Sequence, residues 1–168
     1  MKTYEGLITE LEEHQVFVFG SNLDGFHGGG SAGFASFGVP GNIWRSMHYD
    51  TWPKGERGVW NIKGQGEGYQ EGTDGRSYAL PTVVKAGQPR SISKHGIIKN
   101  ILKFYLYAAA NTDKEFLVAY TMAPNLNGYT PKEMVEMFGF TWPPANVVFE
   151  KTFASHFPIE YHTDIKEL

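Results

Sequence analysis

The chain has 168 residues, of which 41% are apolar and 20% are charged. These fractions are ordinary for a globular domain and exclude an intrinsically disordered chain. The formal net charge is −3 and no stretch concentrates Lys or Arg, so a nucleic-acid partner is not expected. There is no cysteine, which excludes disulfide bonds, thiolate zinc sites and cysteine nucleophiles.

The first residues lack the charged-then-apolar layout of a signal peptide, and no apolar run reaches membrane-spanning length. We therefore expect a cytoplasmic protein of a bacterium or of a phage, with no membrane partner. The length predicts a single domain over residues 1–168 with one sizeable core.

The first elements surround a glycine-rich loop. Residues 4–13 suit a short helix or an edge segment. The apolar run 16–19 predicts a strand buried on both faces and ended by Gly20. Loop residues 21–30 follow, and 31–37 predict a short helix whose amino end faces that loop.

The middle of the chain predicts two strands and a long helix. Residues 59–62 and 77–81 read as strands, the second ended by its proline. Apolar residues then recur at three and four residues over 97–109, which predicts a helix capped by Ser91 or Ser93.

A strand at 116–120 precedes a second helix with clear boundaries. Thr130 suits the cap, Pro131 the first helical position and Glu133 the capping box, and Gly139 ends the helix.

Residues 146–150 predict the last strand. The alternation of strands and helices predicts an α/β fold, with a mixed, largely parallel central sheet in a three-layer α/β/α arrangement.

Gly28, Gly29 and Gly30 follow the first buried strand and precede a predicted helix. Glycines leave backbone N–H groups unhindered, and the helix amino end adds a partial positive charge, so the loop favours a diphosphate or another anion. The alternative is a turn that only reverses the chain. The pattern matches neither a Walker loop nor GxGxxG, which disfavours an ATPase or a dehydrogenase.

Four segments carry a resemblance to macrodomains. GSNLDGFHGGGSAGFA resembles their first phosphate loop, and FLVAYTMAPNLNGYTPKEMVEMF resembles a strand, the second phosphate loop and the following helix. NVVFEKTF resembles the last strand. SYALPT with the long helix after it resembles a unit of the branch that removes terminal ADP-ribose from acidic side chains. Together they cover roughly residues 15–155.

The resemblance implies a fold that binds ADP-ribose or a related nucleotide diphosphate. It implies that Asn22 approaches the distal ribose, that the first loop holds the diphosphate, and that residues 125–128 close over it. Tyr129 would border the ribose, or would instead pack against Met134 as a hydrophobic staple. The ligand-binding residues predicted in this way are Ser21, Asn22, Leu23, His27, Gly28, Gly29, Gly30, Ser31, Ala32, Asn125, Leu126, Asn127, Gly128 and Tyr129.

The chain departs from the catalytic patterns of that family. Hydrolytic members have an aspartate where Ala32 stands, and the terminal ADP-ribose branch has an acid where Asn127 stands. Lys85 matches the lysine of that branch only with a shift. Binding is therefore better supported than hydrolysis of ADP-ribosyl linkages, which stays an additional activity to consider.

Other residues could supply acid–base chemistry at a ribose. His27 titrates near neutrality beside the expected phosphates, and Glu67 or Glu71 could act as a general base. With Lys85 these form the candidate catalytic set; the alternative for each is a solvated loop residue. Asp24 is read as a turn residue.

The six histidines show no pairing typical of metal ligands, so neither a metal nor a cofactor is expected. The four tryptophans could stack on an adenine or belong to the core or an interface; they are Trp44, Trp52, Trp60 and Trp142.

Two further function classes stay open. A non-catalytic interaction protein would use the aromatic-rich segment 34–60 as an interface. An enzyme for another phosphorylated small molecule would show a pocket with Glu67 or Glu71 near the glycine loop. The oligomeric state is not determined by the sequence.

Overall fold

The computed structural model describes residues 1–25, 32, 66–71, 75–162 and 166–167. The predicted strand at 59–62 lies outside these residues. So does the predicted helix at 31–37, apart from Ala32.

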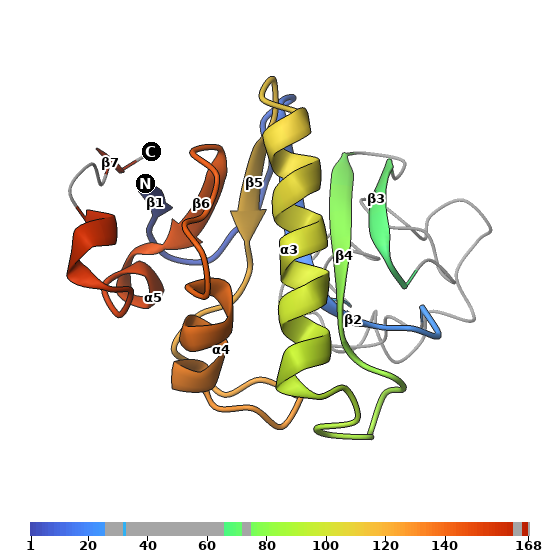
Figure 1. The fold of residues 1–168 in the computed structure, drawn as a ribbon. Helices are drawn as coiled ribbons and strands as arrows, with labels where there is room; N and C mark the ends of the chain where they lie inside the picture. The colour runs from blue at the N-terminus through green and yellow to red at the C-terminus, as the bar shows by residue number, and fades with distance from the viewer. Residues whose placement is uncertain (26–31, 33–65, 72–74, 163–165, 168) are drawn as a thin grey trace.

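Seven strands form one sheet in the order β3-β4-β2-β5-β6-β1-β7 (Figure 1). All neighbouring pairs are parallel except β3 and β4, which are antiparallel. The predicted α/β fold with a mixed, largely parallel sheet is therefore confirmed. The strands are β1 (Lys2–Tyr4), β2 (Gln15–Asn22), β3 (Gly68–Glu71), β4 (Arg76–Val83), β5 (Glu115–Val118), β6 (Val147–Glu150) and β7 (Lys166–Glu167).

The helices begin where cap residues were predicted. Ser93, and not Ser91, caps the long helix by accepting a hydrogen bond from the Gly96 backbone N. Thr130 and Glu133 form the capping box of the next helix. In the described part of the chain, no helix has the length and apolar character that crossing a membrane needs. The helices are α3 (Lys94–Ala110), α4 (Pro131–Phe138), α5 (Lys151–Ala154) and the 3-10 helix η2 (Ile159–His162).

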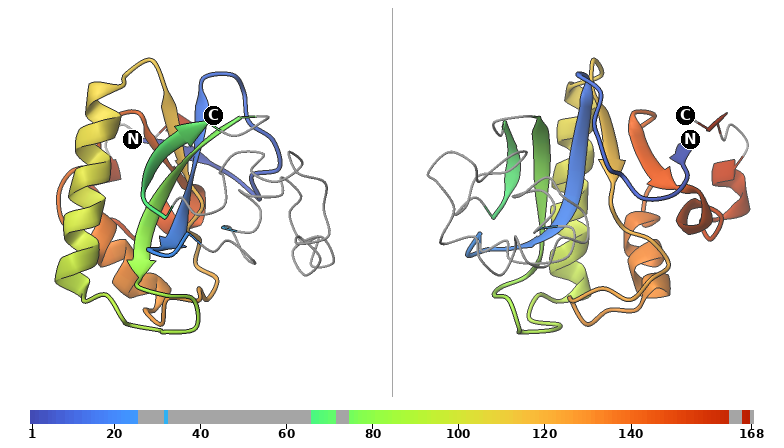
Figure 2. Two further views of the ribbon diagram at one scale, coloured as in Figure 1. Left: turned by 90° about the vertical axis from the view of Figure 1, so that its right-hand side faces the viewer. Right: turned by 180° about the vertical axis from the view of Figure 1, so that it is seen from behind.

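The two faces of the sheet are covered differently. Helices α3 and α4 lie on one face, where alternate residues of β2, β4 and β5 form the larger core with them (Figure 2). On the other face, Phe17 and Phe19 form a smaller cluster with Ala79. The N-terminal segment covers that cluster with Ile8 and Leu11. Among the described residues, the long helices are thus on one face only.

Three local predictions were wrong. Residues 4–13, expected to form a short helix or an edge segment, form no helix, and of these residues only Tyr4 lies in a strand, β1. Strand β2 continues past Gly20 to Asn22, and β4 continues past Pro81 to Val83. Pro81 pairs with Ser21 of β2, and among the described residues it has no neighbour on its other side, because the pairing of β3 with β4 ends at Ala79; proline is tolerated at such a position.

The side chain of Asn146, the residue before β6, connects the end of α3 to the beginning of β5. Its side-chain amide lies within hydrogen-bonding distance of three carbonyl oxygens, at 2.8 Å from Ala108, 3.1 Å from Asn111 and 3.0 Å from Lys114. These carbonyls belong to the last turn of α3 and to the connection into β5. One side chain in front of β6 therefore fixes where the helix ends and the strand begins.

We expect Asn146→Ala to lower the free energy of unfolding by about 1–3 kcal/mol, because partly buried carbonyls lose their donor. Urea denaturation measures the change. Thr112→Ala, at an exposed position in the same connection, is the matched control and should stay within about 0.5 kcal/mol of the wild type. Equal stability of both variants would show that water replaces the Asn146 amide.

Candidate ligand site

The carboxyl ends of the parallel strands β4, β2 and β5 lie side by side (Figure 1). We call this end of the sheet the carboxyl edge, and the end where these strands begin the amino edge. After β2 the chain goes on to the β4 side, whereas after β5 it goes through α4 to β6 on the other side. Such a reversal opens a crevice at the carboxyl ends of strands, and ligands bind there in open α/β sheets. The two loops singled out in the sequence are the ones that leave β2 and β5.

The side chain of Tyr120, two residues after β5, extends across the end of β2 on the face of the sheet that α3 and α4 cover. It belongs to the larger core, and its hydroxyl lies 3.4 Å from Thr82 Oγ1 on the far side of β2. A Cβ added at Gly20 would overlap the Tyr120 hydroxyl oxygen and lie 3.0 Å from Cζ. Gly20 is therefore a position of close approach within β2, and not the end of that strand.

Asn127, in the loop after β5, contacts the same hydroxyl. Its Nδ2 donates to the Tyr120 oxygen at 3.3 Å, and its Oδ1 accepts from the Tyr129 backbone N at 2.9 Å. The residue is only 4% exposed. Burial raises the pKa of Tyr120, so its hydroxyl stays protonated and can donate to Thr82 while it accepts from Asn127.

Arg90 holds the same loop from the outside. Its backbone N donates to the Asn127 carbonyl at 2.8 Å, and its Nε donates to the Gly128 carbonyl at 2.9 Å. Its guanidinium lies 4.6 Å from the centroid of the Tyr129 ring. Gly128 has φ +85°, and a Cβ there would come within 2.7 Å of Pro89 Cβ, so this position requires glycine.

The predicted residues of the first loop are described only in part. Ser21 and Asn22 are buried at the end of β2, and the Ser21 hydroxyl donates to the Gly66 carbonyl. Leu23 is half exposed, and its backbone N donates to the Val84 carbonyl at 3.1 Å. The predicted residues outside the described part are His27, Gly28, Gly29, Gly30 and Ser31.

Ala32 is the next described residue after that gap. It is partly buried against the cluster of Phe17 and Phe19, on the face opposite α3 and α4. The chain therefore leaves β2 at the carboxyl edge, and Ala32 lies on the face of the sheet opposite α3 and α4.

The predicted residues of the second loop lie together at the carboxyl edge. Asn125 Oδ1 accepts from the Asn127 backbone N at 3.0 Å, whereas Leu126 is 85% exposed. The Tyr129 hydroxyl donates to the Ile92 carbonyl at 2.7 Å, and its ring is buried in the same core as Met134. Burial in that core agrees with the staple interpretation of Tyr129.

Two of the catalytic candidates, Lys85 and Glu67, lie near the carboxyl edge but do not form one catalytic group. Lys85 is exposed in a turn after β4, where its carbonyl accepts from the Gln88 backbone N. Glu67 precedes β3, and its carboxylate pairs with Lys103 of α3 at 2.8 Å. Glu67 is therefore engaged along the helix-covered side of the sheet.

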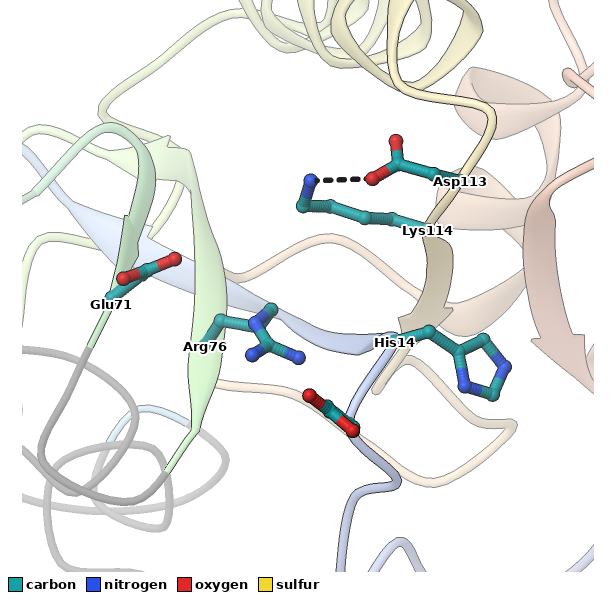
Figure 3. A pocket seen from close by; sticks show the side chains of 6 residues that line it. His14, Glu71, Arg76, Asp113 and Lys114 are labelled. Atoms are coloured by element: carbon teal, nitrogen blue, oxygen red, sulfur yellow. Dashed lines mark hydrogen bonds and ion pairs between the residues drawn. The ribbon is translucent and has the colours of Figure 1, made fainter.

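Glu71 lies at the opposite edge. It pairs in register with Arg76, the first residue of β4, so the length of β4, about 23 Å at ~3.3 Å per residue, separates it from the carboxyl edge. There it lines an open cavity of about 400 Å³ (Figure 3). The lining residues are Glu13, His14, Glu71, Arg76, Asp113 and Lys114. This cavity contains Glu71, one of the predicted acids, but it lies at the edge opposite the end of β2.

Sequence reasoning missed the residues that shape the carboxyl edge. Tyr120 was read as the end of a strand, and Thr82 and Arg90 were given no role. No local sequence pattern shows that Tyr120, Thr82 and Gly20 are in contact. They belong to the ends of three different strands, and the order of strands in the sheet decides which ends are neighbours. Among the described residues, no three His, Asp or Glu side chains gather in a way that could hold a metal ion.

Comparison of the chain with protein-family models, with curated proteins and with solved structures finds no match in any of the three. Function is therefore inferred from the geometry of the described residues together with the sequence motifs.

We expect Gly20→Ala to destabilise the protein by about 1–3 kcal/mol, because its Cβ overlaps the Tyr120 hydroxyl. The same substitution in a Tyr120→Phe background should cost less, with a coupling energy of at least about 0.5 kcal/mol. Denaturant unfolding of the four proteins of this cycle gives the value. Additive effects would contradict the close approach of Tyr120 to Gly20.

The pKa of Glu133 predicts how the stability of the protein depends on pH. The Lys94 ammonium, followed by the Thr130 backbone N–H, lowers the pKa of Glu133 to about 2 from its usual 4.5. Since the folded-state pKa is the lower one, ionised Glu133 contributes stability that is complete above pH 4.5 and lost as the pH falls through 2. Glu133→Gln keeps a capping amide but removes this dependence.

Unfolding of the wild type and of Glu133→Gln at several pH values tests this expectation. The stability difference should be constant near neutrality and shrink between pH 4.5 and 2. Glu136→Gln, at an exposed position in the same helix, is the control and should show no comparable loss. A carboxyl titration of Glu133 by NMR with a midpoint near 4.5 would contradict the prediction.

Proposed function

We propose that the protein binds ADP-ribose or a related nucleotide diphosphate at the carboxyl edge of the sheet. The carrying observation is that β2, which leads into the glycine-rich loop, lies beside β5, which leads into the second loop, where the strand order reverses. The three-layer macrodomain-like arrangement is part of this proposal.

The charge of the carboxyl edge supports an anionic ligand. Residues 84–99, which follow β4 there, contain four cations and no Asp or Glu. Arg90 and Lys94 share one carboxylate, Glu133, at 2.9 and 2.8 Å, so this group keeps a net positive charge. Cations near a crevice raise the local concentration of anions. By contrast, the cavity at the amino edge has three carboxylates in its lining.

Exposed apolar side chains at this edge favour a nucleotide over inorganic phosphate. Leu23 is 50% exposed, Val84 41% and Leu126 85%. Leu23 and Val84 are joined through their backbones at the ends of β2 and β4, and Leu126 lies in the second loop. Apolar surface beside polar anchoring groups suits a ligand with a planar base and charged phosphates.

Binding is better supported than turnover. The Asn127 side chain is an amide, and it is already engaged with Tyr120 and Tyr129. Glu67 is paired with Lys103, and Glu71 lies at the other edge of the sheet. Asp24, two residues after β2, is exposed in a turn, as its Asp-Gly sequence predicts.

We expect ADP-ribose to stabilise the protein by about 2.7 kcal/mol when the free ligand is a hundred times its Kd. Thermal melting with ADP-ribose, ADP, AMP and inorganic phosphate, followed by calorimetric titration, gives the ligand preference. Gly29→Val should abolish the shift while the unliganded protein stays folded, because a side chain there blocks approach to the backbone amides.

Arg76→Ala, in the cavity at the amino edge, is the matched control for this experiment and should bind as the wild type does. ADP-ribose binding with an unchanged Kd in Gly29→Val would contradict the proposed use of the glycine loop. Loss of binding in Arg76→Ala alone would move the site to the opposite edge of the sheet.

A further inference from the structure

We infer that Tyr120 is a positioning residue that latches the second loop, residues 125–129, onto the ends of β2 and β4, and that this latch sets ligand affinity. The effect on affinity rests on the proposed function, since it requires that the loop contacts the ligand. The latch itself is a property of the fold and can be measured without a ligand.

Three elements meet at the Tyr120 hydroxyl. It passes beside Gly20 of β2, lies 3.4 Å from Thr82 Oγ1 of β4, and accepts from Asn127 Nδ2 of the second loop at 3.3 Å. The Tyr120, Thr82 and Asn127 residues are buried, at 7%, 3% and 4% exposed. A hydrogen bond shielded from water in this way is strengthened by its low-dielectric surroundings.

This contact joins the loop to the strand ends. Within the described part of the chain, the other hydrogen bonds of residues 125–129 stay within the loop or go to Arg90, Ile92 and Met134. Those partners lie before α3 or on α4, and not on a strand. Removal of the Tyr120 hydroxyl therefore leaves the loop bound to Arg90 but removes its connection to the ends of β2 and β4.

The released loop has more conformations in the free protein. A ligand that needs one of them must then order the loop on binding, which weakens the measured affinity without removing a contact to the ligand. Tyr120 thus acts through Asn127, and its own hydroxyl is buried beneath the edge.

The first experiment compares two buried tyrosines. Tyr120→Phe should raise the Kd for ADP-ribose about two- to tenfold, the range expected for loss of one net hydrogen bond. Tyr105→Phe is the matched control, because its buried hydroxyl donates to the Phe138 carbonyl at 2.5 Å, at the other end of α4 from the loop. It should lose stability and keep the wild-type Kd.

A second pair of variants tests the contact with β4. Thr82→Ser keeps a hydroxyl for Tyr120 and should bind as the wild type does. Thr82→Val keeps the volume but has no hydroxyl, so its Kd should rise in the same direction as that of Tyr120→Phe. Equal Kd values for Thr82→Val and Thr82→Ser would remove β4 from the latch.

Hydrogen exchange measures the latch itself. The backbone amides of Tyr129 and Arg90 donate to Oδ1 and to the carbonyl oxygen of Asn127. Both amides should exchange faster in Tyr120→Phe, and at the wild-type rate in Tyr105→Phe. Unchanged exchange in Tyr120→Phe overturns the latch, and an unchanged Kd overturns its effect on affinity.

The two proposals fail separately. If wild-type protein does not bind ADP-ribose, the proposed function is wrong, and the effect of the latch on affinity is wrong with it. Faster exchange at Tyr129 in Tyr120→Phe would still establish the latch in that case. If the wild type binds ADP-ribose and Tyr120→Phe binds it equally well, only the further inference is wrong.

Discussion

The close approach of the Tyr120 hydroxyl to Gly20 is the constraint on which the carboxyl edge depends. Because β2 has no side chain at this position, a ring that starts after β5 can reach Thr82 on β4. The same hydroxyl then receives the amide of Asn127. One buried oxygen therefore relates three strand ends and one loop at the carboxyl edge of the sheet.

The two edges of the parallel strands differ in chemistry. At the carboxyl edge a stretch with four cations and no acid follows β4, and exposed apolar side chains border the loops. At the amino edge an open cavity is lined only by titratable or charged side chains, Glu71 among them. This separation supports the proposed binding of an anion at the carboxyl edge, and the length of a strand lies between that edge and Glu71.

Local signals predicted local structure well. The capping box of Thr130 and Glu133 was identified because both partners lie within one helical turn. The strands at 16–19 and 116–120 were identified because a continuous apolar run reports burial on both faces. The ends of the strands were less accurate: Gly20 and Pro81 are usual strand breakers, but here a neighbouring ring and a single-sided stretch of sheet accommodate them.

The sequence by itself determined the α/β class, the largely parallel sheet, the helix caps and the two loops that deserve a ligand hypothesis. Only the tertiary structure decided that those loops leave adjacent strands, that Glu71 lies at the far edge, and that Tyr120 joins Gly20 to Asn127. The physical reason is that periodicity and capping depend on residues a few positions apart. Sheet order, by contrast, brings together residues as distant in the sequence as Lys2 and Lys166, and no local pattern encodes that choice.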